Sequence, residues 1–195
     1  LLSNSIAFTH DNSLWGPSGP LDGTRFNLTL AYTSDIQYSN VNYFSVIADY
    51  RHYARLSQRS AFASRFWLFY NHGKESRRFV MGGSWDLRGW ERWSIRGEKL
   101  WLTSHELRFP FIDELAIRFP VFGLSFFSIR GALFVDAGGA WDRTYEETLG
   151  STGGGIRMNL GGVLVLRYDV GKRIENNFSR FQDGIFHQFF FGWDF

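Results

Sequence analysis

Two pairs of oppositely charged side chains are the residues whose types and spacing come closest to acid–base chemistry. Asp49 and Arg51 form one pair, and Arg167 and Asp169 form the other. A separation of two residues puts both members of a pair on one face of a β-strand. Exposed ion pairs of this kind more often form a solvated ladder than an active site. We therefore interpret both pairs as structural charges on a wetted wall.

The histidines, serines and aspartates form no recognisable catalytic set. No spaced nucleophile and base stand out, no Asp-rich calcium loop is present, and the absence of cysteine excludes disulfides and thiolate nucleophiles. The five histidines are scattered: His10, His52, His72, His105 and His187. We predict no catalytic residue, no metal site and no cofactor, and we predict that the protein is not an enzyme.

Two runs of glycine resemble loops that hold phosphate groups. They are Gly153-Gly154-Gly155 and Gly161-Gly162. A phosphate-binding loop needs a helix N-terminus behind it, and no helical pattern follows either run. Turns, or smooth patches in a sheet, are the better interpretation.

The composition favours a protein with one apolar face and one wet face. Aromatic residues make up 19% of the 195 residues, yet the mean hydropathy is only −0.21. No apolar run approaches the roughly 18 residues of a membrane helix, so any crossing of a bilayer must use strands. The net charge is +2 with scattered basic residues, which indicates no nucleic-acid partner. The chain begins at Leu1 without methionine, so we expect a mature product or a piece of a longer chain.

Period-two alternation predicts an all-β fold with antiparallel connections. No amphipathic helix longer than two turns is indicated. Nine segments alternate: 3–10, 24–33, 42–55, 60–70, 101–109, 126–137, 154–160, 162–170 and 184–195. Bacterial single-chain barrels have an even number of strands. Either one segment is miscounted, or upstream strands are missing, or a partner completes the sheet.

The strands have charged residues opposite apolar ones, which favours a membrane barrel over a soluble one. Phe26, Leu28, Leu30 and Tyr32 share one face of their strand, and Ile129, Leu133 and Val135 share one face of theirs. The opposite faces carry charge at mid-strand, as at Arg65, Glu106, Arg108 and Arg157. The segments are also near the roughly 9–11 residues that cross a bilayer, and aromatics lie near their ends. We expect the apolar faces to contact lipid.

The last segment, 184–195, reads GIFHQFFFGWDF. Alternation puts Phe189, Phe191, Trp193 and Phe195 on one face, together with His187, which we interpret as interfacial. A buried edge strand of a soluble sandwich is the alternative. In a bilayer the free edge must meet a partner, and closure onto segment 3–10 would be parallel. We therefore expect upstream strands or a second copy there.

A long connection, 71–100, separates the fourth and fifth segments. It is rich in tryptophan and glycine, which indicates packing rather than disorder, and the lumen of a barrel is the roomiest place for it. Arg88 in this loop needs acidic partners, because an unpaired guanidinium in a confined site is costly. Glu106 and Asp136 face inward on the next two strands. Gly89 permits close approach of the backbone.

Five motifs in order resemble the BamA-type outer-membrane assembly barrels, the bacterial surface antigen family. The loop carries Gly82-Gly83 and Leu87-Arg88-Gly89-Trp90, similar to the family's GG and RGF-like elements. The others are Asp11-Asn12 with Pro20–Arg25, Glu106–Pro110 (ELRFP), Phe134–Gly138 (FVDAG) and the terminal Phe189-x-Phe191-Gly192-x-x-Phe195. The resemblance covers essentially the whole chain, as about the last eight or nine strands of the family's barrel.

The resemblance implies roles for these residues. Arg88 with Gly89 enters the lumen and pairs with Glu106 and Asp136, while Phe189, Phe191, Gly192, Trp193 and Phe195 form the recognition strand. Client strands of outer-membrane or secreted proteins enter at a seam beside that strand. The implied location is the bacterial outer membrane, in contact with its lipid. The family's periplasmic peptide-binding repeats are absent here, so accessory periplasmic proteins are further candidate partners.

Three functions are compatible with these sequence features. The leading hypothesis is a non-enzymatic barrel for protein assembly, insertion or translocation, with residues 1–195 as one β-barrel domain or its C-terminal part, and 71–100 as a lumen-inserted loop. The second is a passive or structural barrel, against which the long loop argues because it would plug the lumen. The third is a membrane anchor or translocator for a fused periplasmic or passenger domain.

Overall fold

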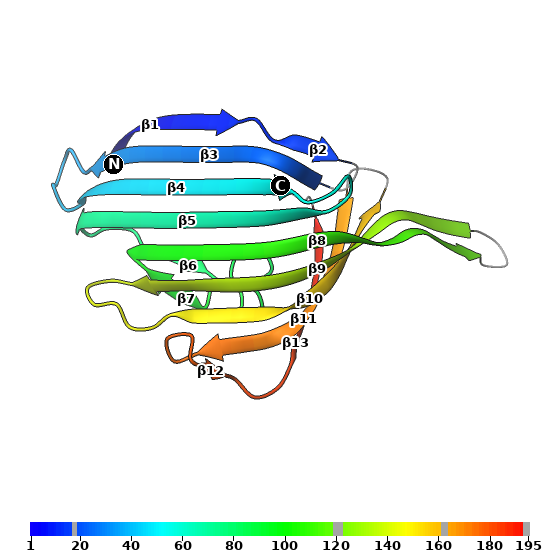
Figure 1. The fold of residues 1–195 in the computed structure, drawn as a ribbon. Helices are drawn as coiled ribbons and strands as arrows, with labels where there is room; N and C mark the ends of the chain where they lie inside the picture. The colour runs from blue at the N-terminus through cyan, green and yellow to red at the C-terminus, as the bar shows by residue number, and fades with distance from the viewer. Residues whose placement is uncertain (17–18, 119–122, 161–163, 193–195) are drawn as a thin grey trace.

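The alternating segments form one large, curved antiparallel sheet (Figure 1). The structure is a computed structural model that describes residues 1–16, 19–118, 123–160 and 164–192. Trp193 and Phe195 of the terminal motif lie outside the described residues, as do Gly161 and Gly162. No helix in the described part of the chain is long and apolar enough to cross a membrane.

Nine main strands make up the sheet in the described residues, and the predicted all-β antiparallel fold is confirmed. They are β1 (Leu2–Asp11), β3 (Gly19–Ser34), β4 (Asn42–Arg55), β5 (Ala61–Lys74), β8 (Lys99–Arg118), β9 (Gly123–Trp141), β10 (Leu149–Leu160), β11 (Leu164–Glu175) and β13 (Phe186–Gly192). Four short strands accompany them: β2 (Leu14–Gly16), β6 (Phe79–Met81), β7 (Ile95–Gly97) and β12 (Arg180–Phe181).

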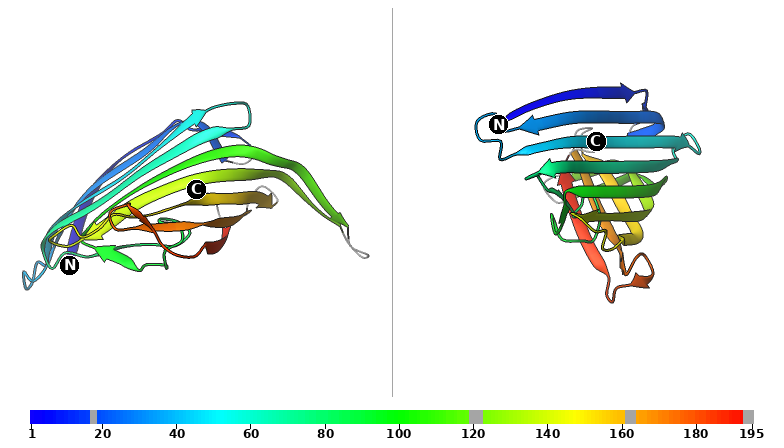
Figure 2. Two further views of the ribbon diagram at one scale, coloured as in Figure 1. Left: turned by 60° about the horizontal axis from the view of Figure 1, so that its bottom comes forward. Right: turned by 90° about the vertical axis from the view of Figure 1, so that its left-hand side faces the viewer.

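The main strands follow one another in chain order, and each pairs antiparallel with the next. Within the described residues β1 and β13 do not pair, so the sheet is open and these strands are its two edges. It curves strongly, and the β6–β7 hairpin lies on the concave side (Figure 2). The sheet therefore has the shape of a barrel wall that is not closed.

The two faces of the sheet differ as alternation requires. Large apolar side chains on the convex face are exposed: Tyr32, Phe66, Leu68, Leu133, Val135, Phe189 and Phe191. Leu30, between Ile6 and Val46 of the neighbouring strands, is half-buried. The concave face carries the charges. Glu106 and Asp136 point there and are buried beneath the loop 71–100.

Ile129 is an exception to the predicted lipid face. It has the parity of Leu133 and Val135, yet it is 3% exposed, whereas Leu133 is 55% exposed. The pairing register of β9 shifts on both sides near this point, between Pro110 and Ile112 of β8 and between Arg157 and Asn159 of β10. Such β-bulges reorient side chains locally, so simple parity fails at Ile129.

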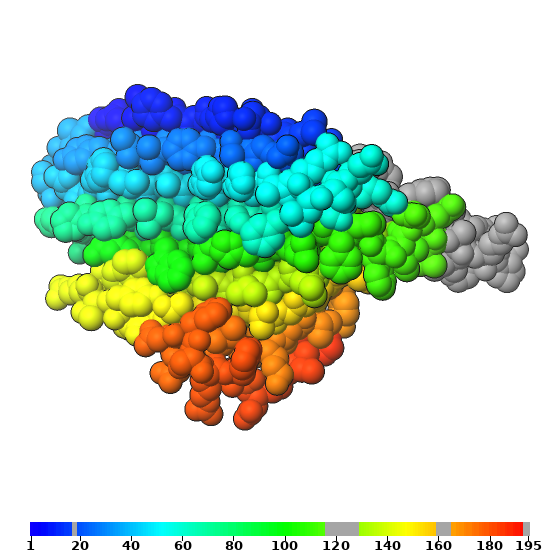
Figure 3. Space-filling view, viewed as in Figure 1, coloured from blue at the N-terminus to red at the C-terminus, as the bar shows by residue number. Residues whose placement is uncertain are grey.

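The β8–β9 hairpin is longer than the predicted segments 101–109 and 126–137. Strand β8 continues to Arg118 and β9 begins at Gly123, so the hairpin projects beyond the rest of the sheet (Figure 1). In the space-filling view the green part of β8 extends in the same direction (Figure 3). The pairing of β8 with β5 stops at Arg108, and only β9 continues beside it. Pro110 lies beside a β-bulge, where proline is tolerated within a strand. Gly153–Gly155 lie inside β10 and not in a turn.

Candidate functional site

The loop 71–100 packs as a small apolar unit against the concave face. Its Met81 and Leu87 are buried together with Leu100 and Leu102 of β8. Partly buried aromatic side chains surround this cluster, among them Trp67, Phe69, Phe79 and Trp90. The indole Nε1 of Trp90 donates to the carbonyl of Gly150 on β10 at 2.9 Å. The loop is therefore fixed to the wall by its own residues, and it carries Arg88 inward.

Arg88 makes a forked ion pair with Asp136. Its Nε donates to Oδ2 at 2.6 Å, and its Nη2 donates to Oδ1 at 2.7 Å. Its Nη1 donates to Oε2 of Glu106 at 2.8 Å, and Nη2 also reaches Oγ of Ser104 at 3.2 Å. The side chain of Arg88 is 4% exposed and that of Asp136 is 0% exposed. Two charge-assisted contacts from one planar fork give both strength and orientation.

Phe134 and two serines complete the surroundings of this pair. The guanidinium carbon of Arg88 lies 3.7 Å from the centre of the Phe134 ring, a cation–π contact. Ser104 donates to Asp136 at 2.6 Å, and Ser151 approaches it at 3.5 Å. Burial alone would lower the pKa of Arg88, but the charges of Asp136 and Glu106 outweigh burial and raise that pKa. The guanidinium is therefore held charged.

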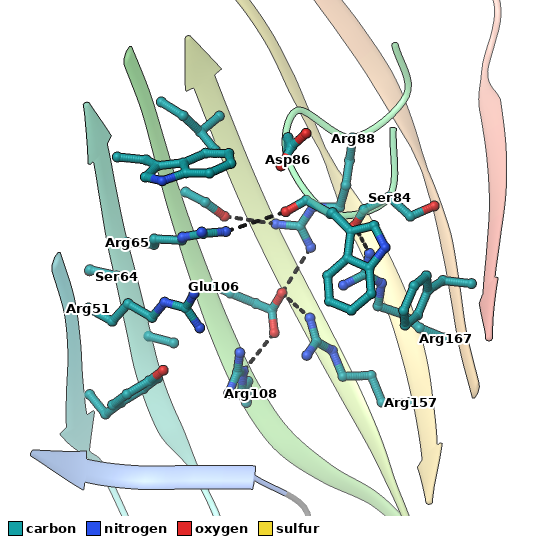
Figure 4. A pocket seen from close by; sticks show the side chains of 17 residues that line it. Arg51, Ser64, Arg65, Ser84, Asp86, Arg88, Glu106, Arg108, Arg157 and Arg167 are labelled. Atoms are coloured by element: carbon teal, nitrogen blue, oxygen red, sulfur yellow. Dashed lines mark hydrogen bonds and ion pairs between the residues drawn. The ribbon is translucent and has the colours of Figure 1, made fainter. Parts of the chain in front are cut away.

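Glu106 is shared by three arginines. Besides Arg88, it accepts hydrogen bonds from Nε of Arg108 at 2.7 Å and from Nη2 of Arg157. Its side chain is 6% exposed. A buried carboxylate is costly unless its oxygens are satisfied, and here cations from the loop, β8 and β10 occupy both oxygens (Figure 4).

Gly89 connects the loop to the end of the sheet. Its φ is +83°, and a Cβ there would lie 2.5 Å from the Phe186 ring of β13. Its N–H donates to Oε1 of Gln188 at 3.1 Å, and its carbonyl accepts from Nε of Arg173 on β11. Both the backbone conformation and the available space require glycine here.

The terminal strand presents different faces to the loop and to the outside. Phe190 points inward, with its ring centre 4.6 Å from that of Trp85 and 5.0 Å from the guanidinium carbon of Arg167. Phe189 is 64% exposed and Phe191 is 56% exposed on the convex side. Gly192 pairs with Val165 of β11. His187 is exposed on the same side as Phe189 and contacts the hydroxyl of Tyr168 at 2.8 Å.

The two charged pairs form ion pairs on the concave wall. Asp49 accepts from Arg51 at 2.9 Å and from Arg65 on the next strand at 2.8 Å. Nε of Arg167 lies 2.9 Å from Oδ2 of Asp169. Within the described residues, no group of three or more His, Asp or Glu side chains is placed to bind a metal ion.

Sequence reasoning missed several contributors to this site. Ser104 and Phe134 share the parity of Glu106 and Asp136 on their own strands, so their inward orientation was open to prediction. Arg157 also had the right parity, but its meeting with Glu106 depends on the register of β9 and β10. Gln188 and Arg173 gave no sequence signal, because their contacts with Gly89 depend on the path of the loop.

Comparisons with known proteins identify the family and the fold of the chain. The Omp85 superfamily domain matches residues 3–193. The chain belongs to the Omp85 superfamily. Its fold is similar to the crystal structure of BamA from Haemophilus ducreyi lacking POTRA domains 1-3, with a TM-score of 0.71 and 18% identity. The match covers 96% of this chain and 42% of that chain. No curated protein matches the chain.

The resemblance predicted from the five motifs is therefore confirmed as membership of the Omp85 superfamily. The chain spans less than half the length of the BamA chain that it matches. At this level of identity the likeness to BamA concerns the fold.

Proposed function

We propose that this chain is the C-terminal part of an integral barrel of the bacterial outer membrane that inserts or translocates other proteins without covalent chemistry. Membership of the Omp85 superfamily and the BamA-like fold support this assignment. The convex face suits lipid, since its exposed side chains are largely aromatic and aliphatic while the charges gather on the concave face.

The observation that carries the proposal is the position of β13. It is an edge of the sheet in the described residues, and its inner face is held by the loop at Gly89 and Trp85. A free strand edge offers backbone N–H and C=O groups to another strand, which is β-augmentation. In hydrocarbon those groups must find a partner. Client strands of outer-membrane or secreted proteins pair at this seam, with upstream strands, a second copy or accessory periplasmic proteins completing the machinery.

In this proposal residues 71–100 form a lumen-inserted loop and Arg88 is its lock. The forked contact with Asp136 and the contact with Glu106 fix the loop to β8 and β9. Gly89 lets the same loop reach β13. The lock therefore connects the wall of the barrel to the strand at which clients arrive. A passive pore is the weaker candidate, because the packed loop occupies the concave side.

Photo-crosslinking from the convex side of β13 tests the seam. A photoreactive phenylalanine analogue replaces Phe191 in one protein and Tyr32, a similarly exposed residue inside the sheet, in a matched control. We expect crosslinks from position 191 to incoming outer-membrane clients and none from position 32. Equal yields from both positions, or crosslinks from neither, would remove the argument for client pairing at β13.

A further inference from the structure

Arg130 of β9 is a buried cation to which the described part of the chain gives no acidic partner. The residue is 5% exposed, and its Nη1 makes no hydrogen bond there. None of the carboxylates in the described residues forms an ion pair with it. An arginine side chain stays charged in a protein. A buried guanidinium is costly unless an acceptor reaches it, so this side chain calls for one.

The side chains whose charges act on Arg130 are all cations: Arg59, Arg108 and Arg157. Each of these three already has an acid. Arg108 and Arg157 both donate to Glu106 (Figure 4), and Arg59 has an exposed ion pair with the β8–β9 hairpin. Arg157 lies directly opposite Arg130 in the strand register, and like charges so placed repel each other. Arg130 therefore experiences repulsion that no described carboxylate offsets.

Arg130 lies at the rim of the sheet, at the end away from the loop 71–100. The pairing of β5 with β8 stops at Ala61 and Arg108, and Arg130 pairs with Pro110 just beyond that point. The loop connects the opposite ends of β5 and β8. The side chain points to the concave side, because its neighbour in register, Arg157, does so. A group that enters the concave space at this rim therefore passes Arg130.

This position is separate from the lock and has different chemistry. The hydrogen bonds of Arg88 go to Asp136, Glu106 and Ser104 and do not involve Arg130. A carboxylate is planar, carries one negative charge and accepts two parallel N–H bonds from a guanidinium. A phosphate would bring more charge and need further donors. The small exposed fraction of Arg130 also favours the smaller group, so a single carboxylate is the best match.

We propose that Arg130 binds a carboxylate of an extended polypeptide segment that enters the concave space at this rim. The carboxylate is either an Asp or Glu side chain or the C-terminus of the segment. The inference rests on the proposed function, in which that segment belongs to a client strand. Pairing at β13 uses main-chain groups, which give affinity but little specificity. Arg130 adds specificity, since it selects segments with an acidic group.

The first measurement asks whether Arg130 is unpaired in the protein alone. Arg130→Met removes the charge and keeps an unbranched side chain. The control is Arg25→Met on the concave side at the same end of the sheet, where Arg25 is paired with Asp11 at 2.9 Å. We expect Arg130→Met to raise the denaturation midpoint of the full chain in an uncharged maltoside detergent, and Arg25→Met not to raise it. A lower midpoint for Arg130→Met would show that the chain supplies its own partner and would overturn the proposal.

The second measurement is peptide binding, followed by fluorescence anisotropy in the same detergent. Three short labelled peptides have alternating threonine and valine. The first has a central aspartate and an amidated C-terminus, the second a central asparagine and a free C-terminal carboxylate, and the third is neutral at both places. At least one carboxylate-bearing peptide should bind about tenfold more tightly than the neutral peptide, because it gains charge-assisted hydrogen bonds. The peptide that does so identifies the source of the carboxylate.

Arg130→Met should abolish this preference and Arg25→Met should retain it. Equal affinity of the parent for all three peptides would overturn the proposal, and so would a preference that survives Arg130→Met. If the methionine variant does not fold, Arg130→Lys replaces it. Lysine keeps the charge but loses the fork, so the preference should weaken and remain measurable, and an unchanged preference would contradict the proposal.

Peptide binding contains no membrane-insertion step, so the two proposals can fail separately. Loss of the carboxylate preference together with normal acceleration of client folding would remove the Arg130 site alone. An intact preference without any acceleration of client folding would remove the assembly function alone.

Discussion

Arg88 and Asp136 are 48 positions apart in the sequence, yet they form a buried, two-pronged ion pair with N···O distances of 2.6 and 2.7 Å. One residue belongs to the loop and the other to the wall strand β9. A pair of this geometry depends on both elements being in place. This one contact therefore depends both on the position of the loop and on the register of the sheet.

Loss of the forked contact should loosen the loop while the sheet remains. Arg88→Lys keeps the positive charge but forfeits the fork, and each charged hydrogen bond that is lost costs about 1.5–3 kcal/mol. The exposed pair of Arg78 with Asp142 has the same two-pronged arrangement, so Arg78→Lys is the matched control and should cost at most about 1 kcal/mol. Limited proteolysis of the loop and denaturation midpoints give the comparison. Similar effects at both positions would argue against a buried lock.

A methyl group at Gly89 should be far less tolerated than one at Gly184. Both glycines have positive φ, +83° and +89°, so alanine adds backbone strain of about 1–2 kcal/mol at each. Only at Gly89 would the new Cβ meet the ring of Phe186, whereas nothing lies within 4 Å at Gly184. Overpacking of this kind costs about 1–3 kcal/mol more. Thermal unfolding of the two alanine variants measures the difference, and equal midpoints would show that β13 does not confine the loop.

Asp86 should make the stability of the loop depend on pH. Burial raises the pKa of Asp86 from 3.8 to about 6, against the opposing effects of Arg65 and a backbone hydrogen bond at Gly82. A carboxyl whose pKa is higher in the folded state destabilises that state once it ionises. Its contribution to stability is therefore greatest below pH 4 and declines as pH rises to about 6.

Asp86→Asn removes this ionisation. The variant should gain stability relative to the parent at pH 7.5, and the gain should shrink at pH 5. Chemical denaturation of both proteins at the two pH values tests the sign. A difference between them that does not change with pH would show that Asp86 titrates normally.

A charged substitution on the convex face should impair membrane insertion more than the same substitution on the concave face. Leu30→Arg places a guanidinium where lipid is expected, at a cost of about 2–4 kcal/mol near the bilayer midplane. Thr29→Arg, one residue away, points to the wetted side and serves as the control. Membrane insertion into phosphatidylcholine vesicles, followed by resistance to urea extraction, compares them. Equal tolerance would mean that the faces are reversed or that the sheet is not embedded.

Alternation predicted the antiparallel sheet because strand parity is a local property. It placed Glu106 and Asp136 on the same face, and the need of a confined guanidinium for acids linked them to Arg88. The extension of the β8–β9 hairpin was not predicted, because proline is usually excluded from the middle of a sheet. In the structure Pro110 lies beside a β-bulge, and β8 continues past it. The prediction that Ile129 faces lipid was wrong for a related reason, because β-bulges interrupt the alternation of side chains along a strand. The contacts of Gly89 with Gln188 and Arg173 depend on long-range packing that no local pattern encodes.

The most direct test of an assembly barrel is the rate at which a client folds into a membrane. The full chain is reconstituted into phosphatidylcholine vesicles, and an unfolded small outer-membrane barrel is added. Folding is followed by the heat-sensitive shift of the client's migration in gels. We predict faster folding than in empty vesicles, and a rate that falls when Arg88→Lys loosens the loop. A rate equal to that of empty vesicles, with or without the substitution, would contradict the proposal that this barrel assembles other proteins.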